Sequence, residues 1–138
     1  AQAGWEQCLQ QGLTPLPVLA ADTSVILAGR IMGKPRDRDH GLEMLTALQG
    51  RVHQVLTAVS LCFQGKTYST MSATQVAFRA VSAAELEQYW ASGEPQGKAG
   101  AYAIQGRAAV FVENIQGSYS GVVGLPLMET HQLLQQLG

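Results

Sequence analysis

The sequence lacks both an excess of charge and a long apolar run. Nine Lys and Arg side chains against ten Asp and Glu give a net charge of −1, so we expect no broad cationic face for nucleic acid or an anionic membrane. No apolar run reaches the length of about 20 residues that a transmembrane helix needs. The opening "AQAGWEQCLQQG" has neither the basic start nor the apolar core of a signal peptide, and resembles the end of a helix.

Cysteine and clustered histidine are also scarce. Cys8 and Cys62 lie far apart without CxxC or Cys/His spacing, which predicts buried, reduced thiols in a cytoplasmic protein. His40, His53 and His131 show no mutual metal-ligand spacing, so we interpret each as a surface or hydrogen-bonded histidine. A metal site made from these residue types alone is therefore not expected.

The first half of the chain predicts strands around a helix. The 138 residues are 46% hydrophobic, enough for the core of one domain, which we place at residues 1–138. Apolar and alternating runs predict strands at 18–27 and 53–63. Between them a leucine stripe predicts a helix that Asp37 caps and Gly50 ends.

The second half continues this alternation. Gln64 and Gly65 predict a hairpin turn into a further strand. Ser82 and Glu85 form a capping box, with Val81 and Leu86 as a hydrophobic staple, at the start of another helix. A strand over 108–119 and a C-terminal helix with Leu127, Leu134 and Leu137 along one side complete the prediction. We expect an α/β fold, a mixed twisted sheet with flanking helices.

Asp22 is the residue whose position in the sequence most needs an explanation. It stands at the centre of "PVLAADTSVIL", and an unpaired carboxylate in an apolar strand would lose several kcal/mol of solvation free energy. It should therefore lie at a strand end, beside a cation, or on a metal. An acid that faces a cleft with Lys34 and Lys98 nearby would suit metal-assisted attack on a phosphate.

Glycine-rich segments offer weaker signals. Lys34 in "GKP" does not belong to a P-loop, because Ala28 and Pro35 stand where that motif needs Gly and Ser or Thr. From this tripeptide alone, a turn with a solvated lysine is the favoured interpretation. In "KAGAYAIQG", Lys98 could meet a phosphate and Gln105 a base edge, while a loop that covers the sheet edge is an equal alternative. For "GSYSGVVGLP", close packing of helix on sheet is favoured over anion binding.

Together, the segments "AADTSVIL", "GKPRD", "GRVHQVLTAV", "GEPQGKAGAYAIQG" and "GSYSGVVGLPL" resemble the Maf family of nucleotide pyrophosphatases in order and spacing. The resemblance runs from about Val18 to the C-terminus. It implies a fold of the inosine-triphosphate-pyrophosphatase type and a cytoplasmic homodimer. It also implies hydrolysis of nucleoside triphosphates to the monophosphate and pyrophosphate with a divalent metal, Mg²⁺ or Mn²⁺.

The resemblance also implies roles for individual residues. Asp22 matches the proton acceptor that activates water and is a candidate metal ligand. Thr23 and Gln105 match positions that set base preference, and "ADT" with "IQG" is the pattern of members that take dTTP and UTP, with modified pyrimidine nucleotides as further substrates. Lys34 and Lys98 match lysines that face the phosphates. Since Asp22 and Thr23 point to opposite faces of a regular strand, we expect the strand to end or bend there.

The sequence departs from the family pattern in ways that keep a second function open. Gly97 stands where the family usually has Asp, and the family's opening strand with its Ser-x-Ser-Pro-Arg-Arg loop is not in the sequence. The chain thus resembles the C-terminal two-thirds of the family's domain, and we expect it to have little activity by itself. The alternative function is a nucleotide-binding regulatory module, linked to septum formation and cell division, with little turnover.

Overall fold

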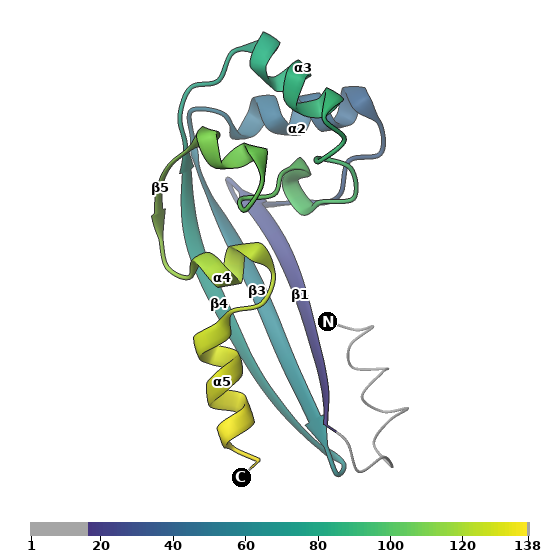
Figure 1. The fold of residues 1–138 in the computed structure, drawn as a ribbon, viewed down its shortest axis with the longest axis vertical. Coiled ribbons are helices and arrows are strands. Elements are labelled where there is room, and N and C mark those ends of the chain that lie inside the picture. Colours follow the sequence, from purple (N-terminus) through teal and green to yellow (C-terminus); the bar gives the residue numbers. More distant parts are fainter. Residues whose placement is uncertain (1–16, 138) are drawn as a thin grey trace.

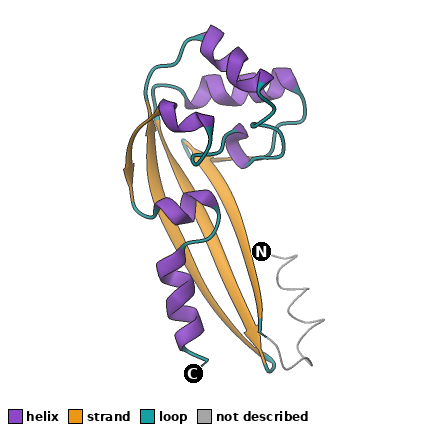
Figure 2. Cartoon of the chain, in the orientation of Figure 1, coloured by secondary structure: helices purple, strands orange, loops and turns teal. Residues whose placement is uncertain are grey.

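The computed structural model describes residues 17–137 as a long antiparallel sheet with helices on one face and at one end (Figures 1 and 2). The helix end expected at residues 1–12 and Cys8 lie outside the described residues. The α/β fold, with one sheet and flanking helices, is confirmed. Among the described residues, no helix has both the length and the apolarity that crossing a bilayer requires.

The sheet has the strand order β2-β1-β3-β4-β5, and each pairing is antiparallel, so the described strands do not show the mixed directions expected from the sequence. Both strands predicted in the first half are present, and the short β2 after the first of them was not predicted. The strands are β1 (Val18–Leu27), β2 (Arg30–Met32), β3 (Val52–Phe63), β4 (Lys66–Phe78) and β5 (Val112–Gln116).

The turn between β3 and β4 confirms the predicted hairpin. Phe63 pairs with Lys66 across it, and Gln64 and Gly65 adopt φ angles of 51° and 77°. Positive φ at both central residues is the type I′ geometry, whose twist matches that of the flanking strands. The hairpin forms the far end of the molecule from α2 and α3 (Figure 1).

The helix starts follow their local signals closely. Helix α2 (Arg38–Leu48) begins after Asp37, whose carboxylate accepts a hydrogen bond from the His40 amide at 2.8 Å. Helix α3 (Ala83–Ala91) begins after Ser82, whose hydroxyl accepts from the Glu85 amide at 3.2 Å. The Glu85 carboxylate also interacts with the Ser82 backbone, as the predicted capping box requires, and it binds Arg79 at 2.7 Å.

Two predictions in the last third need correction. The strand expected over 108–119 is confined to β5, because residues 107–111 form the 3-10 helix η2 (Arg107–Phe111) and residues 119–123 form the short helix α4 (Tyr119–Val123). In α5 (Leu127–Gln135) the expected apolar side is wrong at Leu127 and Leu134, whereas Leu137, just after the helix, packs against the core as expected. Leu127 and Leu134 are 63% and 45% exposed, whereas Leu133 is buried.

The core lies between the sheet and the helices. Its larger part packs α2, α3 and the segment 101–111 against one end of β1, β3 and β4, and a smaller part packs Leu133 of α5 on Val59 and Leu61 of β3. Gly121 of α4 allows close packing, since a Cβ there would lie 2.7 Å from the Ser72 hydroxyl. Packing was the favoured interpretation of that glycine-rich segment.

Cys62 does not match its predicted state. It is buried as expected, but it is disulfide-bonded rather than a reduced thiol.

Candidate functional site

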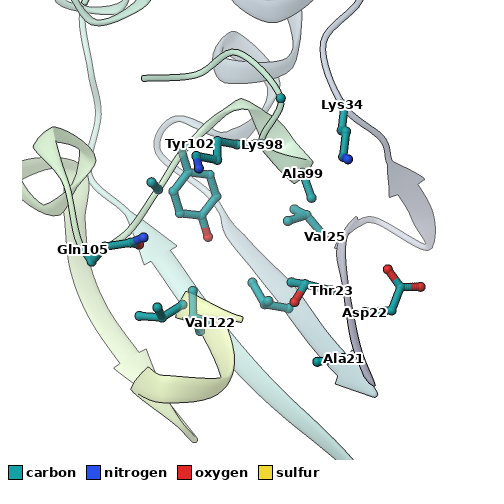
Figure 3. Close-up of a pocket in the computed structure, with 14 residues that line it drawn as sticks. Ala21, Asp22, Thr23, Val25, Lys34, Lys98, Ala99, Tyr102, Gln105 and Val122 are labelled. Atoms are coloured by element: carbon teal, nitrogen blue, oxygen red, sulfur yellow. The ribbon is translucent and has the colours of Figure 1, made fainter. Parts of the chain in front are cut away.

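A pocket of about 260 Å³ opens beside β1 and gathers the predicted site residues (Figure 3). Its walls come from β1 and β3, from the loop after β2, from the segment 97–105 and from α4. The lining includes each of the side chains that the sequence singled out for chemistry: Asp22, Thr23, Lys34, Lys98 and Gln105. These five residues, which span positions 22 to 105 of the sequence, thus share one pocket.

Strand β1 supplies Asp22 and Thr23 without the expected end or bend. Asp22 pairs with Ala58 and Thr23 with Thr57 in the unbroken register of β1 and β3. Their side chains therefore point to opposite faces, and Figure 3 shows them on opposite sides of the strand. Because β2 pairs with β1 only from Val25 onward, this part of β1 has an open edge among the described residues, and the pocket takes in both side chains there.

The lysine-bearing loops are held together by a backbone contact. The Gly100 amide donates to the Gly33 carbonyl at 3.1 Å, which ties the loop of Lys98 to that of Lys34. Gly100 has φ 71°, and a Cβ there would lie 3.0 Å from the Val25 side chain, so the close approach requires glycine. Both lysines are exposed, and neither pairs with an acidic side chain in the described part of the chain.

A half-buried carboxylate, that of Glu94, anchors the segment that carries Lys98 and Gln105. Glu94 accepts from the Tyr89 hydroxyl at 2.5 Å and from the Arg107 amide at 3.0 Å, and the Tyr89 oxygen accepts from the Ala103 amide at 3.1 Å. Burial raises the pKa of Glu94, but these hydrogen bonds lower it by more, so that its pKa lies below the usual value. The segment is therefore fixed at both ends.

Behind the pocket, His53 and Tyr102 form a pair that sequence reasoning missed. His53 is 2% exposed, and its Nε2 lies 2.6 Å from the hydroxyl of Tyr102, which lines the pocket. Burial lowers the pKa of His53 to about 4 and raises that of Tyr102, so both are neutral at pH 7. The alternation of "HQVLTAVSL" was the available signal, because it places residue 53 on the inward face of the strand.

Thr57 is the other residue that was missed. It is fully buried on β3, and its Oγ1 lies 3.0 Å from the Thr23 Oγ1 and 2.6 Å from the Gly121 carbonyl oxygen. Thr57 thus connects the pocket wall on β1 to α4. Its inward position follows from the same alternation that buries His53, but its partners lie in distant parts of the sequence.

The side chains that line the pocket provide few ligands for a metal ion. Asp22 is the carboxylate among its lining residues, and the described residues contain no cluster of three or more His, Cys, Asp or Glu side chains that could hold a metal. Mg²⁺ is often held by one or two carboxylates together with substrate phosphates. The residues present therefore fit a metal that arrives with a phosphorylated ligand, and Asp22 would be its ligand from this part of the chain.

Comparison with known proteins agrees with the resemblance seen in the sequence. The model of the Maf-like protein family matches residues 1–137. A dTTP/UTP pyrophosphatase of Nitrosomonas europaea is 62% identical over 138 residues, all of this chain and 67% of that protein. One of Bordetella avium is 54% identical over 138 residues, again all of this chain and 69% of that protein. One of Alkalilimnicola ehrlichii is 58% identical over 121 residues, 88% of this chain and 59% of that protein.

Proposed function

Because the chain belongs to the Maf family, we propose that it acts as a nucleoside triphosphate pyrophosphatase in nucleotide house-cleaning. Its substrates are dTTP and UTP, as in the names of its relatives, with modified pyrimidine nucleotides as further substrates. The observation that carries the proposal is the pocket that brings an acid, two lysines and a base-reading amide together. The single domain of residues 1–138 corresponds to about two-thirds of the length of these relatives.

The pocket divides by chemistry into a phosphate end and a base end. Lys34 and Lys98 lie on the tied loops, where two cations suit the negative charge of a triphosphate. Gln105 and Thr23 carry neutral groups that donate and accept hydrogen bonds, which suits the edge of a base. Figure 3 shows Gln105 and Lys98 on the same side of β1 as Thr23.

Asp22 takes the part of the general base. A water molecule loses a proton to its carboxylate while the water oxygen bonds to the α-phosphorus. The bond from that phosphorus to the oxygen bridging to the β-phosphate breaks, and pyrophosphate leaves with the electron pair. Asp22 is exposed at the rim of the pocket, where both water and a phosphate can reach it.

A divalent metal, Mg²⁺ or Mn²⁺, belongs to the same proposal. When bound, it would neutralise charge on the phosphate oxygens and on the leaving pyrophosphate. Asp22 would share in holding it, and the two lysines would orient the phosphates.

We expect dTTP and UTP to be hydrolysed to the monophosphate and pyrophosphate with Mg²⁺ or Mn²⁺, with little turnover by this chain alone, and Asp22→Asn to reduce kcat by about a hundredfold or more, because the base is lost. Asp39→Asn, at an exposed acid on α2 outside the pocket, is the matched control and should keep full activity. Equal turnover by Asp22→Asn would remove Asp22 as the base. The same two substitutions are also made at the matching positions of the longer Nitrosomonas europaea relative, where turnover is expected to be higher.

A regulatory nucleotide-binding module is the second candidate function, and Gly97 favours it. This glycine lines the pocket with no side chain at a position where the family pattern places a carboxylate. Calorimetric titration with dTTP in the same samples separates the two functions. Tight binding without pyrophosphate release would favour the module over the enzyme.

The proposal extends to a cytoplasmic homodimer. Exposed apolar side chains on α5, Leu127, Met128 and Leu134, are in keeping with a covered surface. The disulfide at Cys62 is at odds with the proposed location, because disulfides are rare in cytosolic proteins.

A further inference from the structure

Thr23 lies in the pocket wall, and the residues behind it determine whether its hydroxyl donates or accepts hydrogen bonds in the pocket. Its Oγ1 lies 3.0 Å from the Oγ1 of Thr57, and that atom lies 2.6 Å from the Gly121 carbonyl oxygen. The three groups come from β1, β3 and α4, and Thr57 is fully buried between them.

Counting hydrogens gives the direction of each bond. A carbonyl oxygen only accepts, so the single hydroxyl hydrogen of Thr57 goes to Gly121. Thr57 then has only lone pairs left for its neighbour, and the hydrogen of Thr23 must fill the bond between the two threonines. The Thr23 oxygen therefore presents lone pairs, and no hydrogen, to the pocket.

A Thr23 oxygen that can only accept distinguishes between bases that the Gln105 amide cannot distinguish. The amide of Gln105 carries both a donor and an acceptor and can turn by about 180° to suit either pattern. Thr23 cannot turn in this way without breaking its bond to Thr57. Thymine and uracil present an N3–H donor between two carbonyl acceptors, whereas cytosine presents a bare N3 acceptor beside an amino group.

We propose that Thr57 and the Gly121 carbonyl fix Thr23 as a hydrogen-bond acceptor that selects thymine and uracil over cytosine. Thr57 is thus a positioning residue that acts through Thr23. The inference rests on the proposed function, which places the base at Thr23 and Gln105. With cytosine, two acceptors would face each other in a desolvated site, and the loss should be on the order of tenfold to a hundredfold in kcat/KM.

The test is the ratio of kcat/KM for dTTP to that for dCTP in variants of Thr57. Thr57→Val keeps the shape but removes the hydroxyl, so that Thr23 regains a hydrogen to donate to cytosine. We expect this ratio to fall by about tenfold in Thr57→Val and to be retained in Thr57→Ser, which restores the hydroxyl. An equal loss with both nucleotides, and an unchanged ratio, would mean that Thr57 is merely structural.

Thr74→Val is the matched control. Thr74 is another buried threonine that holds the start of α4, through hydrogen bonds with the Ser118 carbonyl and amide at 3.3 and 2.9 Å, and it has no contact with Thr23 among these bonds. Its loss should lower the melting temperature and leave the ratio unchanged. A fall in the ratio as large as in Thr57→Val would show that any loosening of α4 has this effect, and would overturn the inference.

Two measurements on the unsubstituted protein keep the inference separate from the proposed function. If dTTP is neither bound nor hydrolysed, the proposed function fails; where turnover is too low to measure, the dissociation constants of dTTP and dCTP replace the kinetic ratio. Equal affinities would overturn the inference. Independently of any nucleotide or variant, NMR should detect a slowly exchanging Thr57 hydroxyl proton close to Gly121, and a Thr57 proton directed to Thr23 would contradict the assigned direction.

Discussion

A single buried histidine makes the stability of this protein depend on pH. Burial lowers the pKa of His53 from 6.5 to about 4, so the folded state keeps the ring neutral while the unfolded chain takes up a proton at higher pH. Above pH 6.5 the neutral ring of His53 is buried at no cost in protonation. As the pH falls from there toward 4, the unfolded chain takes up the proton and the free energy of unfolding decreases. Over the whole interval the loss is about 3 kcal/mol.

Urea unfolding at about pH 7.5 and about pH 5 should reveal this loss. We expect the free energy of unfolding to fall by about 2 kcal/mol more in the unsubstituted protein than in His53→Gln, which cannot titrate. His131→Gln, at an exposed histidine, should behave like the unsubstituted protein. The same pH dependence in all of them would assign it to carboxylates such as Glu85 and Glu94, whose pKa values are also lowered.

The sequence indicated which residues line the pocket but not what lies behind them. Asp22, Thr23 and Gln105 stood out because their residue types conflict with apolar surroundings or match a family pattern, and they do line it. Thr57 and His53 appeared as ordinary members of an alternating strand. Their roles arise from the register of β3 with β1 and from contacts with Gly121 and Tyr102, and no local pattern encodes those distances.

At the scale of elements, the contact of α2 with α3 depends on one glycine. A Cβ on Gly41 would lie 2.2 Å from the ring of Trp90, far inside van der Waals contact. Gly41→Ala should therefore destabilise the protein by about 1–3 kcal/mol, although alanine by itself favours a helix by about 1 kcal/mol. Gly33→Ala, with nothing within 4 Å of the added Cβ, is the control and should be neutral in thermal unfolding. A stabilised Gly41→Ala would show that the helices separate easily.

Elements were predictable where their signals are local. Asp37, Ser82 and the Gln64–Gly65 turn act on backbone within three residues, and these predictions are confirmed. The apolar side of α5 was wrong because Leu133, not Leu134, meets β3. Which of several leucines is buried depends on how the helix lies on the sheet, and a stripe of leucines on both sides leaves that open.

On the scale of the whole molecule, the pocket joins parts of the chain that are far apart in the sequence. Strand β1, the loop of Lys34, the segment with Lys98 and helix α4 meet there, and the Gly100 to Gly33 bond ties two of them. A ligand that binds all of them stabilises the folded state as a whole. The α/β class was visible in the alternation of strands and helices, whereas this convergence required the sheet order.

Binding of dTTP should therefore raise the melting temperature. At about 100 times its dissociation constant the ligand stabilises the fold by about 2.7 kcal/mol, a rise of several degrees in a differential scanning measurement. In Lys98→Ala or Lys34→Ala we expect a roughly tenfold weaker affinity and about half of that stabilisation at the same concentration, because each removes a cation from the phosphate end. Added salt should reduce the difference between these variants and the unsubstituted protein in the rise of melting temperature. Lys66→Ala, at the exposed turn between β3 and β4 and outside the pocket lining, should keep the full rise. If all three variants kept it, the triphosphate would lie elsewhere and neither pocket lysine would face it.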